Sequence, residues 1–359
     1  SGVSRLNYPL IDGVVNGCPS HLLEPTRSND LQKSQEFNDS YWTKYQSSVL
    51  DNLSISPDGS LNADKLIEDN SSATHQLGRA INYVSGTTYT VSIFAKSSNR
   101  NLEISAGNTN TFPAKAIFDL SNGIVLSTTF GNASIKYFGN GWYRCVISST
   151  AASTSTTNIN FGIVNGYALS YNGDGSSFLE LFGVSREIGS YATSYISTNG
   201  SAVTRSAETA NDAGDASTFN DSEGVLFAEI ADIKNDDGVE KRLSIQDGGT
   251  FDAVRITFTP TTNSITGVVY NNGATQCNLV HVVSNTENFN KIALKYKAND
   301  FALWINGIEV ATDNSGTVFN NGALDKLSFD LFNNAKVYGS TKQIQYFDSA
   351  LNDSELETL

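Results

Sequence analysis

Alternating apolar and polar positions recur along the chain, most clearly in Asn290–Thr312 (NKIALKYKANDFALWINGIEVAT). Apolar side chains take every second position from Ile292 to Tyr296 and again from Phe301 to Ile305, which is the period of a half-buried β-strand. The dipeptide Asn306-Gly307 is favoured in type I′ hairpin turns, because both central residues of that turn need a positive φ. This segment therefore predicts three short antiparallel strands joined by two tight turns.

The same alternation predicts a complete sandwich in residues 203–359. Further strands are expected at 224–233, 254–258, 265–270, 327–331 and 343–347. Asn352, followed three residues later by Glu355, is a capping pattern and predicts one short terminal helix. No other helix is expected in the chain.

Residues 30–200 show strand-length runs separated by turn signals at about ten-residue intervals, which is typical of a β-sandwich. The run 87–96 (TTYTVSIFAK) alternates most cleanly, with Tyr89, Val91 and Ile93 on one face. Residues 1–29 are instead expected to form an extended N-terminal segment interrupted by prolines, here called the N-terminal lead. Its Leu22 and Leu23 are expected to pack against a neighbouring domain. The sequence thus predicts an all-β chain of two antiparallel β-sandwiches, jelly-roll-like and concanavalin-like, behind an extended N-terminal lead.

Length and charge agree with this organisation. A chain of 359 residues is too long for one small sandwich, so two domains are expected. The net charge of −14 argues against binding to nucleic acid or to an anionic membrane, since both require a basic surface. No apolar run approaches the roughly 18 residues of a membrane span. The start at Ser1-Gly2 and the absence of Met suggest a processed product or an excised fragment.

The three cysteines, Cys18, Cys145 and Cys277, are far apart and odd in number, so the chain is no disulfide scaffold. Cys145 lies in a strand-like run and is expected in the core. A bond between Cys18 and Cys277 is an open alternative.

Catalytic signatures are weak, and we expect no enzyme. The three histidines are isolated, and no serine lies in a G-x-S-x-G elbow. Glycoside hydrolysis needs two carboxylates on one sheet face. The nearest pattern, Glu229 and Asp232, places the two carboxylates on opposite faces of a strand unless a bulge intervenes.

Calcium is a candidate cofactor, because it binds to loop carboxylates and carbonyl oxygens. The best clusters are Asn172 with Asp174, and Asn235 with Asp236 and Asp237. Each cluster also reads as an ordinary turn, since Asn, Asp and Gly favour turns without any metal.

Glycan binding would use exposed aromatic side chains that stack on sugar rings. Trp304 faces away from Phe301, Leu303 and Ile305 and is a candidate by alternation alone. The other candidates are Trp42, Tyr167 and Tyr171, although for Trp42 packing in the core is favoured.

Two regions resemble known families. The K-I-A-L-K-Y and F-A-L-W-I-N-G-I-E-V-A runs of residues 291–311 resemble the concanavalin A-like (laminin G-like) lectin sandwich. Residues 17–29 (GCPSHLLEPTRSN) resemble a leader of phage tail-associated proteins, from which His21, Ser28 and the adjoining Asp30 depart. The ordered motifs from YWTK at residue 41 to YATSYISTNGSAVTR, ending at residue 205, resemble the carbohydrate-binding-module-like sandwich that follows this leader.

The resemblance implies a non-catalytic adhesin on the surface of a phage virion, such as a tail fibre or spike, that recognises host polysaccharide outside the cell. It also implies a symmetric homo-oligomer, with a trimer among the options. Two alternatives remain open: an ancillary glycan-binding fragment of a polysaccharide-degrading enzyme, and a purely structural virion decoration protein.

Overall fold

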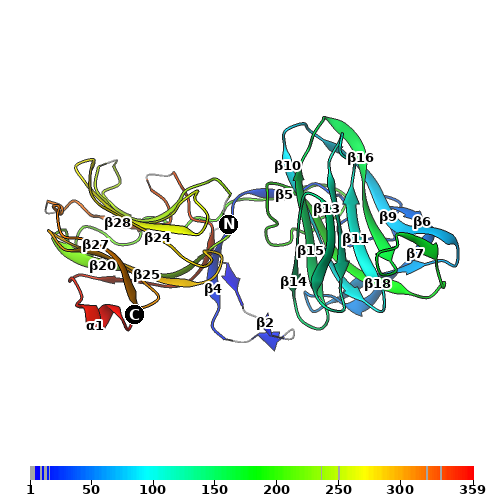
Figure 1. Ribbon diagram of the computed structural model, residues 1–359, viewed down its shortest axis with the longest axis horizontal. Helices are drawn as coiled ribbons and strands as arrows, with labels where there is room; N and C mark the ends of the chain where they lie inside the picture. Colours follow the sequence, from blue (N-terminus) through cyan, green and yellow to red (C-terminus); the bar gives the residue numbers. More distant parts are fainter. Residues whose placement is uncertain are drawn as a thin grey trace. The chain divides into compact units, whose positions relative to one another are not determined.

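β-Strands account for nearly all of the regular structure, as the alternation predicts. The structure is a computed structural model that describes residues 5–8, 10–11, 14–15, 17–235, 237–249, 251–320, 322–331 and 334–359. The chain divides into two units, one of Leu10–Asn16 and Thr26–Ser206, and the other of Ser1–Pro9, Gly17–Pro25 and Ala207–Leu359. Each unit contains one antiparallel β-sandwich (Figure 1), which confirms the expected fold class.

Two large sheets form the first sandwich, in the orders β14-β15-β10-β18-β8-β7 and β13-β12-β11-β16-β9-β17, with β6 paired to β9. The strands of the former sheet are β7 (Ser47–Ile55), β8 (Leu61–Glu68), β10 (Thr88–Ser97), β14 (Asn132–Tyr137), β15 (Tyr143–Thr150) and β18 (Phe178–Ile188). Those of the latter are β6 (Thr43–Tyr45), β9 (Ser72–Tyr83), β11 (Asn101–Ala106), β12 (Ala114–Asp119), β13 (Ile124–Phe130), β16 (Ser155–Val164) and β17 (Ser170–Asn172). Two short ladders, β2 (Leu10–Ile11) with β3 (Val14–Val15) and β5 (Arg27–Asn29) with β19 (Val203–Arg205), belong to the same unit.

Alternation along the strands fills the core of the first sandwich. Tyr89, Val91 and Ile93 of β10 are all buried in one apolar cluster, as their spacing predicts. Cys145 lies fully buried in the same cluster. The side chains that β10 contributes to this core therefore follow from the period of two.

The second sandwich also has two sheets, in the orders β1-β4-β29-β20-β25-β26-β27 and β24-β23-β22-β21-β28. The strands of the former are β1 (Leu6–Asn7), β4 (Ser20–Leu23), β20 (Glu223–Asp232), β25 (Asn290–Lys297), β26 (Phe301–Ile305), β27 (Ile308–Asp313) and β29 (Gly339–Phe347). Those of the latter are β21 (Lys241–Gln246), β22 (Ala253–Phe258), β23 (Ser264–Asn271), β24 (Ala274–Val282) and β28 (Lys326–Ser328).

The meander predicted in Asn290–Thr312 is present as β25, β26 and β27. Asn306 and Gly307 have φ values of 53° and 77°, so both turn residues are left-handed, as an Asn-Gly hairpin requires. Phe301, Leu303 and Ile305 face the main core between the two sheets.

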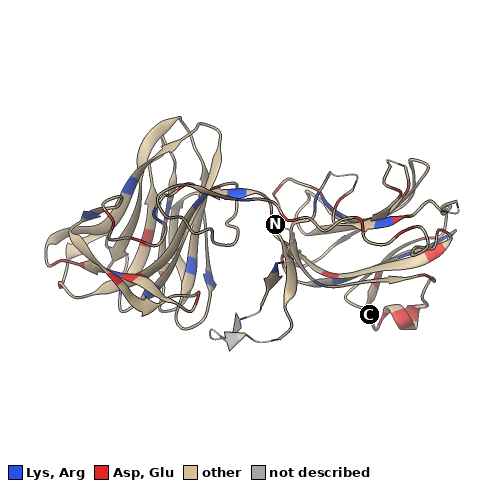
Figure 2. Ribbon diagram, turned by 180° about the vertical axis from the view of Figure 1, so that it is seen from behind, with Lys and Arg blue, Asp and Glu red and all other residues tan. Residues whose placement is uncertain are grey.

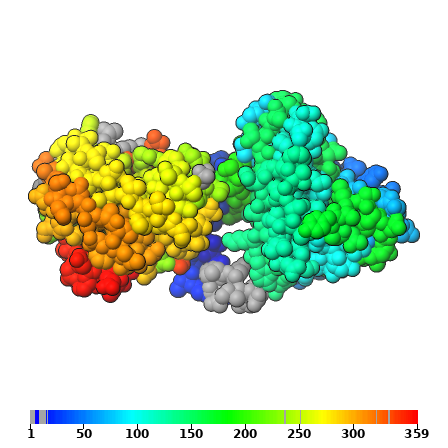
Figure 3. Space-filling view, viewed as in Figure 1, coloured from blue at the N-terminus to red at the C-terminus, as the bar shows by residue number. Residues whose placement is uncertain are grey.

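The opposite face of this meander is covered by the chain's C-terminus. Helix α1 (Asp353–Leu356) is capped by Asn352 and Glu355 in the reciprocal arrangement that the sequence predicts. Leu356 and Leu359 pack against Trp304 and its neighbours in a second, smaller apolar cluster. Figure 3 shows the red C-terminal residues lying on the orange surface of this sandwich, and Figure 2 marks the acidic positions of α1 in red on the ribbon. No helix of the described residues has the length and apolarity needed to cross a bilayer.

The N-terminal lead contributes to the second sandwich. Leu23 is 2% exposed in its main core, because β4 pairs with β29. Arg5 forms ion pairs with Glu24 at 2.8 Å and Glu208 at 2.6 Å.

The alternative of a disulfide between Cys18 and Cys277 is wrong, because both are free thiols, Cys18 exposed and Cys277 buried.

Candidate functional site

Two of the four candidate glycan-stacking residues are buried: Trp42 takes its favoured alternative of packing in the core, and the exposure expected of Trp304 is wrong. Trp42 is 2% exposed; it packs against Phe37 and Phe161 and donates its Nε1–H to the carbonyl of Lys33 at 2.9 Å. Trp304 is 7% exposed, because helix α1 covers the face on which alternation places it. Neither ring is available to a sugar.

The other two predicted aromatic residues lie near the surface. Tyr167 is 66% exposed and sits in the turn between the bridged residues Asn165 and Ala168. Tyr171 is only partly exposed, since its hydroxyl donates to the Glu68 carboxylate and its ring lies 4.9 Å from that of His75. Tyr167 remains a candidate for stacking, whereas Tyr171 belongs to an internal network.

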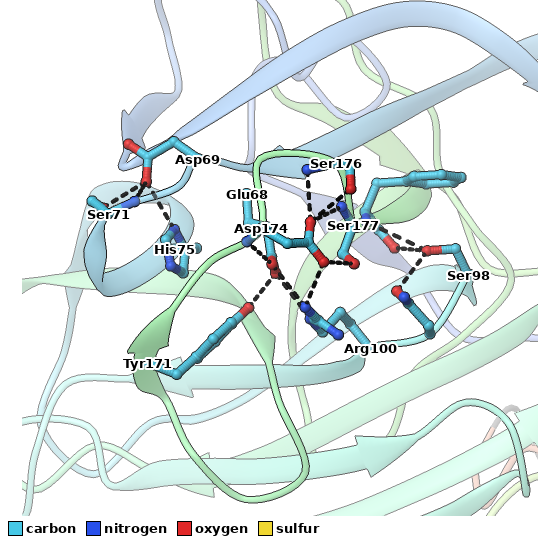
Figure 4. A network of polar contacts seen from close by, with 12 residues as sticks. Glu68, Asp69, Ser71, His75, Ser98, Arg100, Tyr171, Asp174, Ser176 and Ser177 are labelled. Carbon is cyan, nitrogen blue, oxygen red and sulfur yellow. Dashed lines mark hydrogen bonds and ion pairs between the residues drawn. The ribbon is translucent and has the colours of Figure 1, made fainter.

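That network centres on Glu68, whose side chain is fully buried (Figure 4). Arg100 binds it through two nitrogens, Nε at 3.0 Å and Nη2 at 2.8 Å, in a bidentate pair. The backbone N–H of Asp174 donates to Glu68 at 2.9 Å. Burial alone would raise the pKa of Glu68, but the hydrogen bonds from Arg100 and Tyr171 outweigh it and lower the pKa below the ordinary value. The carboxylate is therefore satisfied within the protein.

Asp174, a predicted calcium ligand, is occupied in the same way. Its carboxylate accepts hydrogen bonds from the N–H and hydroxyl groups of Ser176 and Ser177, at 2.6–2.8 Å, and from Arg100 at 3.0 Å. These bonds hold the pKa of Asp174 well below its ordinary value. Asn172, its predicted co-ligand, lies exposed in β17. A cation at Asp174 would have to displace Arg100.

The second predicted calcium cluster contains a lysine ammonium group. Asp236 lies outside the described residues. The carboxylate of Asp237 accepts from Lys241 Nζ at 2.9 Å, and Asp232 lies 3.1 Å from the same nitrogen. Lys241 is 2% exposed, so an internal cation already balances these carboxylates. Asn235 instead exchanges hydrogen bonds with Asn263. The part of the chain that is described contains no group of three or more His, Cys, Asp or Glu side chains arranged to hold a metal.

The Glu229–Asp232 pattern forms no pair of catalytic carboxylates. The extra residue of a local bulge is Lys342 on the neighbouring strand β29, so alternation along β20 is unbroken. Glu229 binds Lys342 at 2.7 Å, and Asp232 is paired with Lys241 as described.

A polar pocket in the first sandwich was missed by the sequence analysis. It has a volume of about 480 Å³ and is bounded by strands β7 and β8 and by the loop before β6. Four carboxylates and four amides line it: Glu36, Asp39, Asp51, Asp64, Gln35, Asn38, Asn52 and Asn62.

A β-bulge shapes this pocket. Leu50 pairs with Lys65 and Ser54 with Ala63, so three residues of β7 face the single residue Asp64 of β8. Within the bulge, Asn52 takes a left-handed φ of 53°, a conformation that asparagine tolerates better than most residues.

Asp64 ties the two walls of the pocket together. It is 2% exposed and accepts the backbone N–H of Asn52 at 2.9 Å and that of Phe37 at 3.0 Å. Burial raises its pKa to about 6 against the effect of these two bonds, and the nearby Asp51 and Glu36 raise it further. The floor of the pocket thus carries a carboxyl group that forms no ion pair with any described Lys, Arg or His side chain.

Hydrogen-bond acceptors are in excess in the pocket. The shielded atoms Oε2 of Glu36 and Oδ1 of Asn62 have no hydrogen-bond partner. Lys33, 3.6 Å from Asp39, forms the one ion pair with a lining carboxylate among the described residues. The sequence carries no clear signal for this bulge, because Val49, Leu53 and Ile55 keep one parity and a bulge of three residues against one leaves that parity unchanged.

No protein-family model matches this sequence, and no curated protein matches it either. Similar solved structures include the CBM40 of the Ruminococcus gnavus IT-sialidase bound to α2,3-sialyllactose, at 18% identity and a TM-score of 0.34, covering 42% of this chain and 95% of that one. Domains LG4-5 of the mouse laminin α1 chain are 10% identical with a TM-score of 0.28, over 79% of this chain and 90% of that one. The tripod from the baseplate of bacteriophage Tuc2009 is 12% identical with a TM-score of 0.24, over 98% and 99% of the respective chains. Similarities at this level do not assign a function.

Proposed function

We propose that this chain is a non-catalytic carbohydrate-binding protein, and that the polar pocket of the first sandwich is its glycan site. The observation that carries the proposal is the pocket itself, a cavity of about 480 Å³ lined only by carboxylate and amide side chains. Its volume falls within the roughly 300–1,000 Å³ typical of small-molecule sites. Carboxylates and amides are well suited to hydrogen-bond the hydroxyl groups of a sugar.

The excess of acceptors favours a ligand rich in donors. Sugar hydroxyls can donate to the unpartnered oxygens of Glu36 and Asn62. An acidic sugar would instead place its carboxylate near Asp51 and Asp64, which is unfavourable at close range. We therefore propose a neutral saccharide as the ligand of this pocket.

The biological setting follows from the sequence resemblance alone. The leader-like residues 17–29 favour a virion adhesin that recognises host polysaccharide outside the cell, acting as a homo-oligomer. Calcium remains a proposed cofactor of that adhesin.

The test combines a glycan array with calorimetry on the full chain, with and without a calcium chelator. We expect binding to a neutral glycan, and a loss of about tenfold in affinity for Asn62→Ala and for Glu36→Gln, equivalent to about 1.4 kcal/mol. Asn122→Ala is the matched control, because Asn122 also donates its amide to a nearby aspartate but lies outside the pocket. Failure to bind any glycan, or equal binding by all three variants, would refute the proposal.

A further inference from the structure

The outer face of the five-stranded sheet in the second sandwich carries an arginine pair. Leu243 and Ile256 point into the core, so the alternate residues of β21 and β22 point outward. In the register of these strands Arg242 lies opposite Thr257, and Ser244 lies opposite Arg255. Arg242 and Arg255 therefore sit diagonally on one small patch of the sheet.

The positive charge of this pair is only partly balanced. Arg242 is bound to Glu240, and 21% of its side chain is exposed. Arg255 stacks 4.4 Å above the ring of Tyr270 and donates to its hydroxyl at 3.3 Å. In the described part of the chain no carboxylate comes within ion-pair distance of Arg255. Burial lowers the pKa of Arg255 and the neighbouring charge of Arg242 lowers it further, while Tyr270 and Glu240 act in the opposite direction.

Several donors on the patch have no partner. The Nε atoms of Arg242 and Arg255 and the hydroxyl oxygen of Thr257 are shielded from solvent and make no hydrogen bond. Thr257 is only 4% exposed, so water does not readily satisfy it. Unsatisfied buried donors are uncommon in folded proteins and call for a specific explanation. Two guanidinium groups with a hydroxyl between them match an oxyanion, which accepts bonds from all three.

We propose that this patch binds an oxyanion, a carboxylate or sulfate group carried by an acidic saccharide, between Arg242 and Arg255 with the Thr257 hydroxyl as the third donor. Binding requires the two guanidinium groups to rotate so that the shielded donors, the Thr257 hydroxyl included, face the ligand. Tyr270 positions Arg255 by stacking beneath it. The site is separate from the neutral-sugar pocket and does not depend on it.

The experiment is calorimetric titration of the full chain with three probes of similar length: tetragalacturonate, a sulfated tetrasaccharide and neutral maltotetraose. We expect one of the two anionic probes, or both, to bind in low salt and to weaken as salt is added, because the attraction is electrostatic. Arg255→Gln and Arg242→Gln should each weaken that binding by about tenfold or more. The two anionic arms distinguish a carboxylate site from a sulfate site.

Two variants serve as matched controls. Lys297→Gln makes the same change of charge on the other sheet of this sandwich and should bind the anionic probes as the wild type does. Asn62→Ala, in the other sandwich, should also leave this binding unchanged. If Arg255→Gln fails to fold, Arg255→Lys replaces it as the test. This variant keeps the positive charge but loses the planar guanidinium group that can bind an oxyanion through two nitrogens, so it should still weaken binding. The proposal is overturned if neither anionic probe binds, or if the arginine variants bind them as tightly as Lys297→Gln does.

Discussion

Two polar clusters in the first sandwich both contain a buried carboxylate, yet they differ in what surrounds it. Glu68 is 1% exposed and receives two bonds from Arg100, one from Tyr171 and one from the backbone of Asp174. Asp64 is 2% exposed and receives only two backbone N–H bonds. The pKa of Glu68 is lowered, whereas that of Asp64 is raised to about 6.

The contrast supports different roles for the two clusters: one stabilises the fold, and the other is the proposed ligand site. The Glu68 carboxylate has partners on both oxygens, and the cluster leaves little space for a ligand: a Cβ at Gly173 would lie 1.9 Å from the Asp69 carbonyl oxygen. The Asp64 cluster faces a cavity and keeps unpartnered acceptors at Glu36 and Asn62. A satisfied network stabilises the fold, whereas an unsatisfied one has capacity left for binding.

The largest expected effect is that of Arg100→Met. It removes the bidentate partner of Glu68 and leaves a buried charge unpaired, so we expect a loss of about 3–5 kcal/mol in the free energy of unfolding. Urea denaturation measures this loss. The double variant Glu68→Gln with Arg100→Met should recover much of it, because no charge is then left buried. A loss below about 1 kcal/mol, the usual value of a surface ion pair, would show that water can replace Arg100 as the partner of Glu68.

Much of the fold could be predicted from sequence because it depends on local patterns. The meander of β25 to β27 follows from period-two alternation and one Asn-Gly dipeptide, and α1 follows from Asn352 and Glu355. These signals act within a few residues of one another, so no knowledge of the remaining fold is needed.

The sites depend on contacts between distant residues and were largely missed. Trp304 faces away from the main core, as alternation predicts, but a helix about fifty residues later in the sequence covers it. The pocket requires the loop around Glu36, a bulge at Asn52 and strand β8 to meet. Asp174 was a reasonable candidate by residue type, but only the structure shows that Arg100 and two serines occupy its oxygens.

The next effect concerns pH. The pKa of Asp64 in the folded protein, about 6, lies above its ordinary value of 3.8. Its contribution to stability is therefore complete below about pH 4 and is lost as the pH rises through 6, a change of up to about 3 kcal/mol. Glu68, with a lowered pKa, has the opposite sign: its contribution is present above its ordinary pKa and is lost as the pH falls.

Urea denaturation from pH 4 to pH 7 should show a flatter pH dependence of the unfolding free energy for Asp64→Asn than for the wild type. Asp119→Asn is the control, since hydrogen bonding lowers the pKa of Asp119 and its titration falls at more acidic pH. The same slope for wild type and Asp64→Asn would mean that Asp64 titrates normally, and the contrast with Glu68 would then disappear.

The smallest expected effects come from two single variants, one in each cluster. They should have opposite effects on stability and on glycan affinity, and so test whether the two clusters have different roles. Tyr171→Phe removes one hydroxyl donor from Glu68 while Arg100 remains, so the unfolding free energy should fall by about 1–2 kcal/mol. Glycan affinity should not change, because Tyr171 does not line the pocket. Asn62→Ala should do the reverse, with stability within about 0.5 kcal/mol of wild type and weaker glycan binding. Chemical denaturation and calorimetry on the same two proteins measure both quantities. If Tyr171→Phe loses glycan affinity while Asn62→Ala keeps it, the two clusters have the opposite roles, and the binding site lies beside Glu68.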